Sequence, residues 1–145
     1  MVEFNEIELR DSFIKDIQEI YNQAYDVLAS EVYVDKRFSQ EASFPACVVS
    51  ILEPTSAERY ADSNGTYQFI NLSLNCNLYS NELENFSLDD SVIKLKQILI
   101  KGILEKYSNF VVTRDTDVPF RTDVFRRNVT FRFTYDHINK IIYSN

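Results

Sequence analysis

The chain has 145 residues, of which 45% are hydrophobic and 14% aromatic, so it is long and apolar enough to bury a core and is not globally disordered. Its formal net charge of −7 disfavours general nucleic-acid binding. No apolar run approaches the ~20 residues of a membrane-spanning helix, and the acidic segment Met1–Glu6 lacks the basic-then-apolar pattern of a secretion signal, which predicts a protein that stays in the cytoplasm.

An amphipathic helix is predicted from Asp11 to about Ser30, with Asp11 or Ser12 as its N-cap. Apolar residues recur there at steps of three and four, at Ile14, Ile17, Tyr21, Ala24 and Leu28, with Ile20 and Val27 beside them. A short strand is expected next, at Glu31–Val34, and a turn at Asp35–Arg37.

Two longer strands follow, and they are predicted to pair. The first runs from about Ala46 to Glu53, with Pro45 at its start, where proline is tolerated. The polar loop Pro54–Thr66 contains the turn signal Asn64-Gly65. The strand before this loop and the strand after it, Tyr67–Asn81, are therefore expected to form an antiparallel pair.

The strand Tyr67–Asn81 has two unlike faces, because side chains of a strand point alternately to opposite sides. One parity is apolar and consists of Ile70, Leu72, Leu74, Cys76 and Leu78. The other carries amides and a hydroxyl, at Asn71, Ser73, Asn75 and Asn77. A solvated face usually carries charged residues and threonine, so this face predicts contact with other protein surface.

A second helix is predicted to start at Ser87, which fits the N-cap, with Asp89 and Asp90 at the positive end of its dipole. Its apolar stripe consists of Val92, Leu95, Leu99, Ile103 and Leu104, widened by Ile98 and Ile100.

Three strands are expected after this helix, at Phe110–Arg114, Asn128–Asp136 and Lys140–Tyr143. A charged loop around Pro119 is predicted from Arg114 to Arg127. The order α-β-β-β-α-β-β-(β) predicts an α+β fold in which two helices pack against an antiparallel sheet, as a single domain over residues 1–145.

Charge is distributed unevenly along the chain. Residues 1–90 contain 17 acidic and 5 basic side chains, whereas residues 91–145 contain 5 acidic and 10 basic ones. Unlike ends suit head-to-tail association, in which the basic patch of one copy meets the acidic patch of the next. The alternative is two solvated faces of opposite charge without such a role.

No residue pattern predicts catalysis, and the chain is not expected to be an enzyme. Cys47 and Cys76 lie in apolar strands and are interpreted as reduced, buried side chains rather than a metal pair or a redox site. The one histidine, His137, is interpreted as a turn residue because no nucleophile pattern accompanies it.

Acidic and glycine residues do not predict a site either. Asp89 and Asp90 are explained by their place at a helix start, and the spacing of Asp115, Asp117 and Asp123 does not match a calcium loop. With two glycines in the chain, no phosphate-binding loop can be assigned. No catalytic, cofactor-binding or metal-ligating residue is predicted.

The order and local patterns of these segments resemble the tail-terminator, or tail-completion, proteins of long-tailed bacteriophages, also labelled minor tail proteins. The resemblance covers nearly the whole chain. It is carried by the leading helix, Phe44–Val49, the strand ending in Asn77–Asn81, the lysine-containing helix, Phe110–Arg114, Val124–Tyr135 and the ending Ile141–Tyr143. The acidic connection Asn81–Asp89 and the arginine-rich loop around Pro119 depart from that pattern.

This resemblance implies a structural virion protein of the tail and neck, assembled in the cytoplasm of a host bacterium. Such a protein forms a homo-oligomeric ring, usually a hexamer, that caps the tail tube and gives the surface on which the head-tail connector docks. Its expected partners are therefore copies of itself, the tail tube protein and the connector protein. No membrane and no cofactor are expected, and nucleic acid is expected only as DNA passing through the ring.

Two loops are predicted to carry the partner contacts, because long connections between strands are usually functional. Pro54–Thr66 offers Glu58, Arg59 and Tyr60, a charged and aromatic cluster of the kind that anchors interfaces. Asp115–Arg127 offers Phe120, Arg121, Arg126 and Arg127. Phe120 is expected either to pack on its own domain or to contact a neighbour.

Three alternatives remain open. The first is another neck component, such as a head-closure or adaptor protein. The second is a nucleic-acid-binding module that uses Arg121, Arg126, Arg127 and Arg132, although Phe131 and Phe133 share the core parity and are not expected to stack on bases. The third is a small enzyme.

Overall fold

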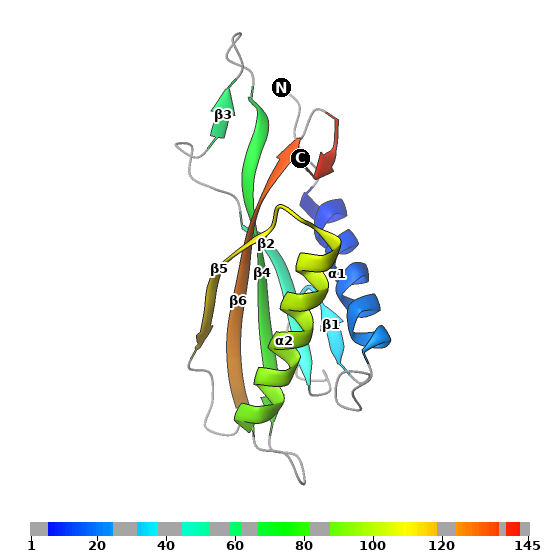
Figure 1. The fold of residues 1–145 in the computed structure, drawn as a ribbon, viewed down its shortest axis with the longest axis vertical. Helices are drawn as coiled ribbons and strands as arrows, with labels where there is room; N and C mark the ends of the chain where they lie inside the picture. The colour runs from blue at the N-terminus through cyan, green and yellow to red at the C-terminus, as the bar shows by residue number, and fades with distance from the viewer. Residues whose placement is uncertain are drawn as a thin grey trace.

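A computed structural model describes residues 6–24, 32–37, 45–52, 59–61, 67–81, 88–118, 124–136 and 139–142. It has the predicted α+β fold, with both helices packed on a mixed, mostly antiparallel sheet (Figure 1). The elements are α1 (Glu6–Gln23), β1 (Tyr33–Asp35), β2 (Ala46–Leu52), β3 (Arg59–Ala61), β4 (Tyr67–Asn81), α2 (Leu88–Lys106), β5 (Val111–Asp117), β6 (Val124–Asp136) and β7 (Ile141–Ile142).

The sheet is built around the pairing of β4 with β6. Its main order is β1-β2-β4-β6-β5, with β3 beside β4 and β7 beside β6. β4 has the predicted bounds, and its antiparallel pairing with β2, which joins Ala46 to Tyr79 and Leu52 to Ser73, is also confirmed. The sheet is not purely antiparallel, because β1 runs parallel to β2.

Helix α1 begins earlier than predicted, at Glu6 rather than Asp11, so Asp11 and Ser12 are exposed residues within the helix and not its cap. Its buried stripe is Leu9, Phe13, Ile17 and Tyr21. Ile14, Ile20 and Ala24 are only partly buried at the flank of this stripe. The predicted stripe was therefore shifted, because it left out Leu9 and Phe13.

Helix α2 buries the predicted positions Val92, Leu95, Leu99 and Ile103, whereas Leu104 is 40% exposed. It approaches α1 closely at Gly102. A Cβ atom on Gly102 would lie 2.5 Å from Cγ2 of Ile20, well inside van der Waals contact. The glycine therefore allows the two helices to cross at short distance.

The core lies between the helices and one face of the sheet. It contains the apolar parity of β4, Val49 and Ile51 of β2, and the residues of β6 from Val129 to Tyr135 that share one parity. An aromatic cluster fills one end, where the ring of Phe133 lies 5.3 Å from Phe13 and is stacked at 4.7 Å on Phe110. Both helices therefore cover the same face of the sheet.

The predicted charged loop from Arg114 to Arg127 is wrong for most of its length. β5 continues to Asp117 and β6 begins at Val124, and the two strands pair through this region. Asp115 and Asp117 have low strand propensity, but hydrogen bonds to β6 and their ion pairs with Arg127 outweigh it. The predicted loop Pro54–Thr66 likewise contains the short strand β3.

Candidate functional site

The face of the sheet turned away from the helices is the candidate functional surface, and we call it the open face. It combines the polar parity of β4 with the facing residues of β6, which pair across the two strands. These polar side chains are Asn71, Ser73, Asn75 and Asn77 of β4 and Asn128, Thr130, Arg132 and Thr134 of β6. The predicted amide-and-hydroxyl face of β4 is thus extended by β6.

A hydrogen-bonded network occupies the middle of the open face. The Nδ2 group of Asn128 donates to Oδ1 of Asn75 at 2.7 Å and to Oδ1 of Asn77 at 2.9 Å. The Thr130 hydroxyl donates to Oδ1 of Asn128 at 2.8 Å, and Nδ2 of Asn75 donates to Oγ of Ser50 at 3.1 Å. Asn128 and Thr130 are buried, which neutral polar groups tolerate when they are hydrogen-bonded.

A second cross-strand bond extends this pattern along the same two strands. The Thr134 hydroxyl donates to Oδ1 of Asn71 at 3.0 Å, and Asn71 is buried as well. The amides and hydroxyls therefore hold one another in fixed rotamers. A surface of this kind is polar and uncharged, and it is ordered before any partner binds.

Two exposed arginines lie beside the network on the open face. Arg132 of β6 pairs with Val111 of β5, and Arg114 of β5 pairs with Thr130 of β6, so both share the parity of the network. Across the described residues, neither arginine forms an ion pair. Their positions are diagonal neighbours, roughly 7–8 Å apart.

The opposite side of the same two strands has balanced charges. Arg127 contacts Asp115 at 2.7 Å and Asp117 at 2.8 Å, and Nζ of Lys96 on α2 lies 3.1 Å from Asp115. Partial burial alone would raise the pKa of Asp115, but the hydrogen bonds from Arg127 and Lys96 outweigh it, so the pKa lies below its ordinary value.

A groove of about 730 Å³ runs between the two helices on the far side of the core. Ile20 and Gly102 lie in it, and its walls carry both signs of charge, with Asp16 and Glu19 on α1 and Lys101 on α2. Lys106 contacts Asp16 at 2.9 Å, and the Tyr107 hydroxyl donates to the same carboxylate. These bonds hold α1 against the C-terminal end of α2. The charged side chains along the groove therefore have a role in helix packing and do not by themselves indicate a ligand site.

The two cysteines lie in the core, as predicted, and both are free thiols. A hydrogen bond with Cys47, and then burial, raise the pKa of the Cys76 thiol. The Tyr21 hydroxyl, which lies near both, donates to the backbone oxygen of Leu95 at 2.9 Å. Protonated, buried thiols are poor nucleophiles, which favours a packing role.

The described members of the predicted interface are not brought into one place. Arg126 and Arg127 are consecutive residues of strand β6, so their side chains point to opposite faces, and Arg127 is held in ion pairs on the helix side. Arg59 and Tyr60 belong to β3, which pairs with Ile70 and Phe69 of β4. Glu58, Phe120, Arg121 and His137 lie outside the described residues.

The sequence predicted the part of the open face that lies on β4 but not the part that lies on β6. The alternation in Tyr67–Asn81 identified its polar side, but the contribution of Asn128 and Thr130 depends on the pairing of β4 with β6. The alternation Asn128-Thr130-Arg132-Thr134, opposite the apolar parity of β6, is the signal that identifies them.

The part of the chain that the structure describes contains no group of three His, Cys, Asp or Glu side chains placed to hold a metal ion. None of the described helices is long and apolar enough to span a membrane. No protein-family model and no protein of curated function matches this sequence.

Proposed function

We propose that this protein is a structural component of a phage tail, a tail terminator that caps the tail tube as a ring and forms the head-tail joining surface. The observation that supports this most is the one-sided fold. Both helices cover one face of the sheet and leave on the other face an ordered network of neutral polar side chains, with the exposed Arg114 and Arg132 beside it. Such a surface suits contact between protein subunits better than chemistry on a small molecule.

The layout of the chain in space agrees with this proposal. Helix α1, with five acidic and two basic side chains, comes from the acidic first 90 residues and lies to one side of the molecule, whereas β6 and β5, with four basic and three acidic side chains, come from the basic remainder and take the other side (Figure 1). A subunit with unlike sides favours head-to-tail contacts, which close into rings when the rotation allows it.

The nucleic-acid-binding alternative has less support. Phe131 and Phe133 are buried under the helices and cannot stack on bases. Of the described arginines it would use, Arg126 and Arg132 share the open face, whereas Arg127 lies on the opposite face and is neutralised by two aspartates. The three described arginines therefore do not form one basic surface.

The test is reconstitution with tail tubes that lack a terminator, followed by negative-stain electron microscopy. The protein is expected to add a ring-shaped density at one end of each tube and to make these tubes competent to join filled heads. A parallel incubation with filled heads alone is the control. Attachment to heads but never to tubes would contradict the proposal and favour a head-closure protein.

A further inference from the structure

We propose that copies of this protein join head to tail, with the arginine pair on the open face of one copy against the acidic side of α1 of the next. The arginine pair is Arg114 and Arg132, and the acidic side of α1 is the exposed stretch that includes Glu8 and Asp11. This inference deepens the proposed function, since a ring needs a contact of this kind between its subunits.

The arginine pair indicates an anionic partner. Arg114 and Arg132 are exposed diagonal neighbours, and an anion placed between two like charges at this distance is attracted by both and removes their repulsion. The described open-face residues of β4, β5 and β6 include one carboxylate, Asp136, which is buried and accepts hydrogen bonds from Asn139. Nothing described on this face neutralises the two guanidinium groups.

Helix α1 presents a matching anionic surface. Glu8 and Asp11 are exposed and one helical turn apart, with about 5–6 Å between their Cβ atoms, close to the spacing of the arginine pair. Asp11 contacts its neighbour Arg10 at 3.3 Å, but its side chain stays 59% exposed and accessible. Glu19 is exposed on the same helix, and so is Lys15, one turn from Asp11, so this side of α1 is acidic in sum but includes one exposed cation.

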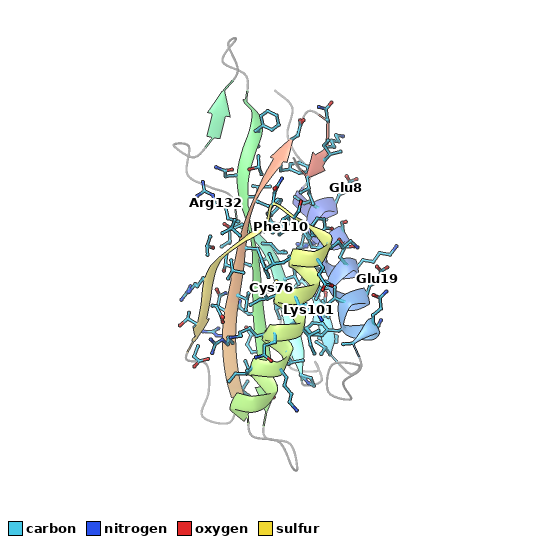
Figure 2. The ribbon with its side chains drawn as sticks, in the orientation of Figure 1. Glu8, Glu19, Cys76, Lys101, Phe110 and Arg132 are labelled. Carbon is cyan, nitrogen blue, oxygen red and sulfur yellow. The ribbon has the colours of Figure 1, made fainter. Side chains whose placement is uncertain are left out.

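These two surfaces cannot meet within one copy. Figure 2 shows Arg132 at the left of the sheet and Glu8 and Glu19 on α1 at the right, with the core between them. A symmetric contact between two open faces would place arginine against arginine, which is repulsive. The charges therefore favour a contact that repeats from copy to copy in one direction.

A second copy explains the open face better than nucleic acid does. Binding to a phosphate backbone draws on many cations, whereas the described part of this face has two exposed arginines and the half-buried Arg126, and the uncharged network beside them adds no attraction for phosphate. Neutral amides and hydroxyls flanking a charged pair are typical of the polar rim of a protein interface.

The test is a charge swap measured by sedimentation equilibrium at low salt and up to millimolar protein. Arg114→Glu/Arg132→Glu and Glu8→Arg/Asp11→Arg are each expected to weaken self-association by at least ~10-fold, equivalent to about 1.4 kcal/mol. The chain that carries all four substitutions is expected to regain it. Lys101→Glu, an exposed charge on α2, is the matched control and should leave association unchanged.

Several outcomes would overturn the inference. They are a wild-type protein that stays monomeric, variants that fold with unchanged melting temperature and still associate normally, or failure of the four-fold swap to restore association. Binding of duplex DNA that is lost in Arg114→Glu/Arg132→Glu, without self-association, would also overturn it. If both charge-reversed variants still capped tail tubes, this contact would be wrong but the proposed function would stand. If the charge swaps weakened and restored self-association as expected but the protein did not cap tubes, the proposed function would be wrong and the contact would stand.

Discussion

The two faces of strands β4 and β6 are built from alternate residues of the same segments, yet they are stabilised by different forces. The helix-covered face is apolar and packs five buried residues of β4 against α1 and α2. The open face carries amides and hydroxyls that are satisfied by one another across the strand pair, and at one end it buries a small apolar cluster of Ala46, Tyr79 and Val124. Burial of apolar area therefore holds the fold together, while cross-strand hydrogen bonds fix the shape of the open face.

The largest loss of stability is expected on the covered face. Phe133→Ala removes a ring that is 2% exposed and contacts Phe13 and Phe110, so the free energy of unfolding should fall by ~3–5 kcal/mol. Thr134→Ala, the next residue and on the open face, should cost only ~1 kcal/mol for its bond to Asn71. Urea denaturation measures both, and equal losses would contradict the difference between the faces.

Removing the centre of the polar network should have an intermediate effect. Asn128→Ala removes the donor to Oδ1 of Asn77 and one of the two donors to Oδ1 of Asn75, which keeps the Thr130 hydroxyl at 3.1 Å, so the free energy of unfolding should fall by ~1–3 kcal/mol. Ser73→Ala on the same face is the control and should change it by less than ~0.5 kcal/mol. If Asn128→Ala were as mild as the control, the network would not be a unit.

The fit of the helices over the covered face can be tested at Gly102. Gly102→Ala places a methyl group 2.5 Å from Ile20, and the overpacking cost of ~1–3 kcal/mol should exceed the ~1 kcal/mol that alanine gains in helix propensity. Ile20→Ala in the same chain should make Gly102→Ala neutral or stabilising. Thermal unfolding of the single and double variants decides, and a single variant more stable than wild type would show that the helices can separate freely.

The smallest effect is expected from charges on the helix side of β5. Since the folded-state pKa of Asp115 lies below its unfolded value, its ion pairs stabilise the protein above about pH 4 and lose this effect as the pH falls through the folded pKa. Asp115→Asn should therefore cost less than ~1 kcal/mol at pH 7 and nearly nothing at low pH. Thr116→Ala, which faces the other side, should show no such pH dependence in denaturation measured at both pH values.

The sequence was most informative where one physical signal acted alone. The alternation in Tyr67–Asn81 and the apolar stripe around Leu95 and Leu99 predicted β4 and the buried side of α2, because burial decides both. The start of α1 was missed because Asp11 resembles a cap, although Leu9 and Phe13 continue the apolar stripe towards the N-terminus.

Other features depend on contacts between distant segments and could not be read locally. Taken singly, Arg127, Asp115 and Asp117 are typical of a loop. Their place in paired strands depends on the ion pairs that they form across β5 and β6. The parallel direction of β1 and the diagonal placement of Arg114 beside Arg132 also follow from pairing rather than composition. The predicted loop-borne interface stays a prediction for Glu58, Phe120 and Arg121, which lie outside the described residues, and the surface proposed above lies on strands.

The pairing of β4 with β6 also has a consequence for how quickly the chain reaches its folded state. This ladder joins Asn81 to Val124 at its near end and Phe69 to Asp136 at its far end, so more than 40 residues separate every pair of partners. Contacts so remote along the chain form only after a large loop has closed, and the entropy of that closure is lost before the contacts stabilise the protein. Proteins dominated by such contacts fold slowly. Until β6 arrives, both the apolar and the amide face of β4 lack their main neighbour. The segment 67–81 is therefore the part of the nascent protein most exposed to incorrect pairing.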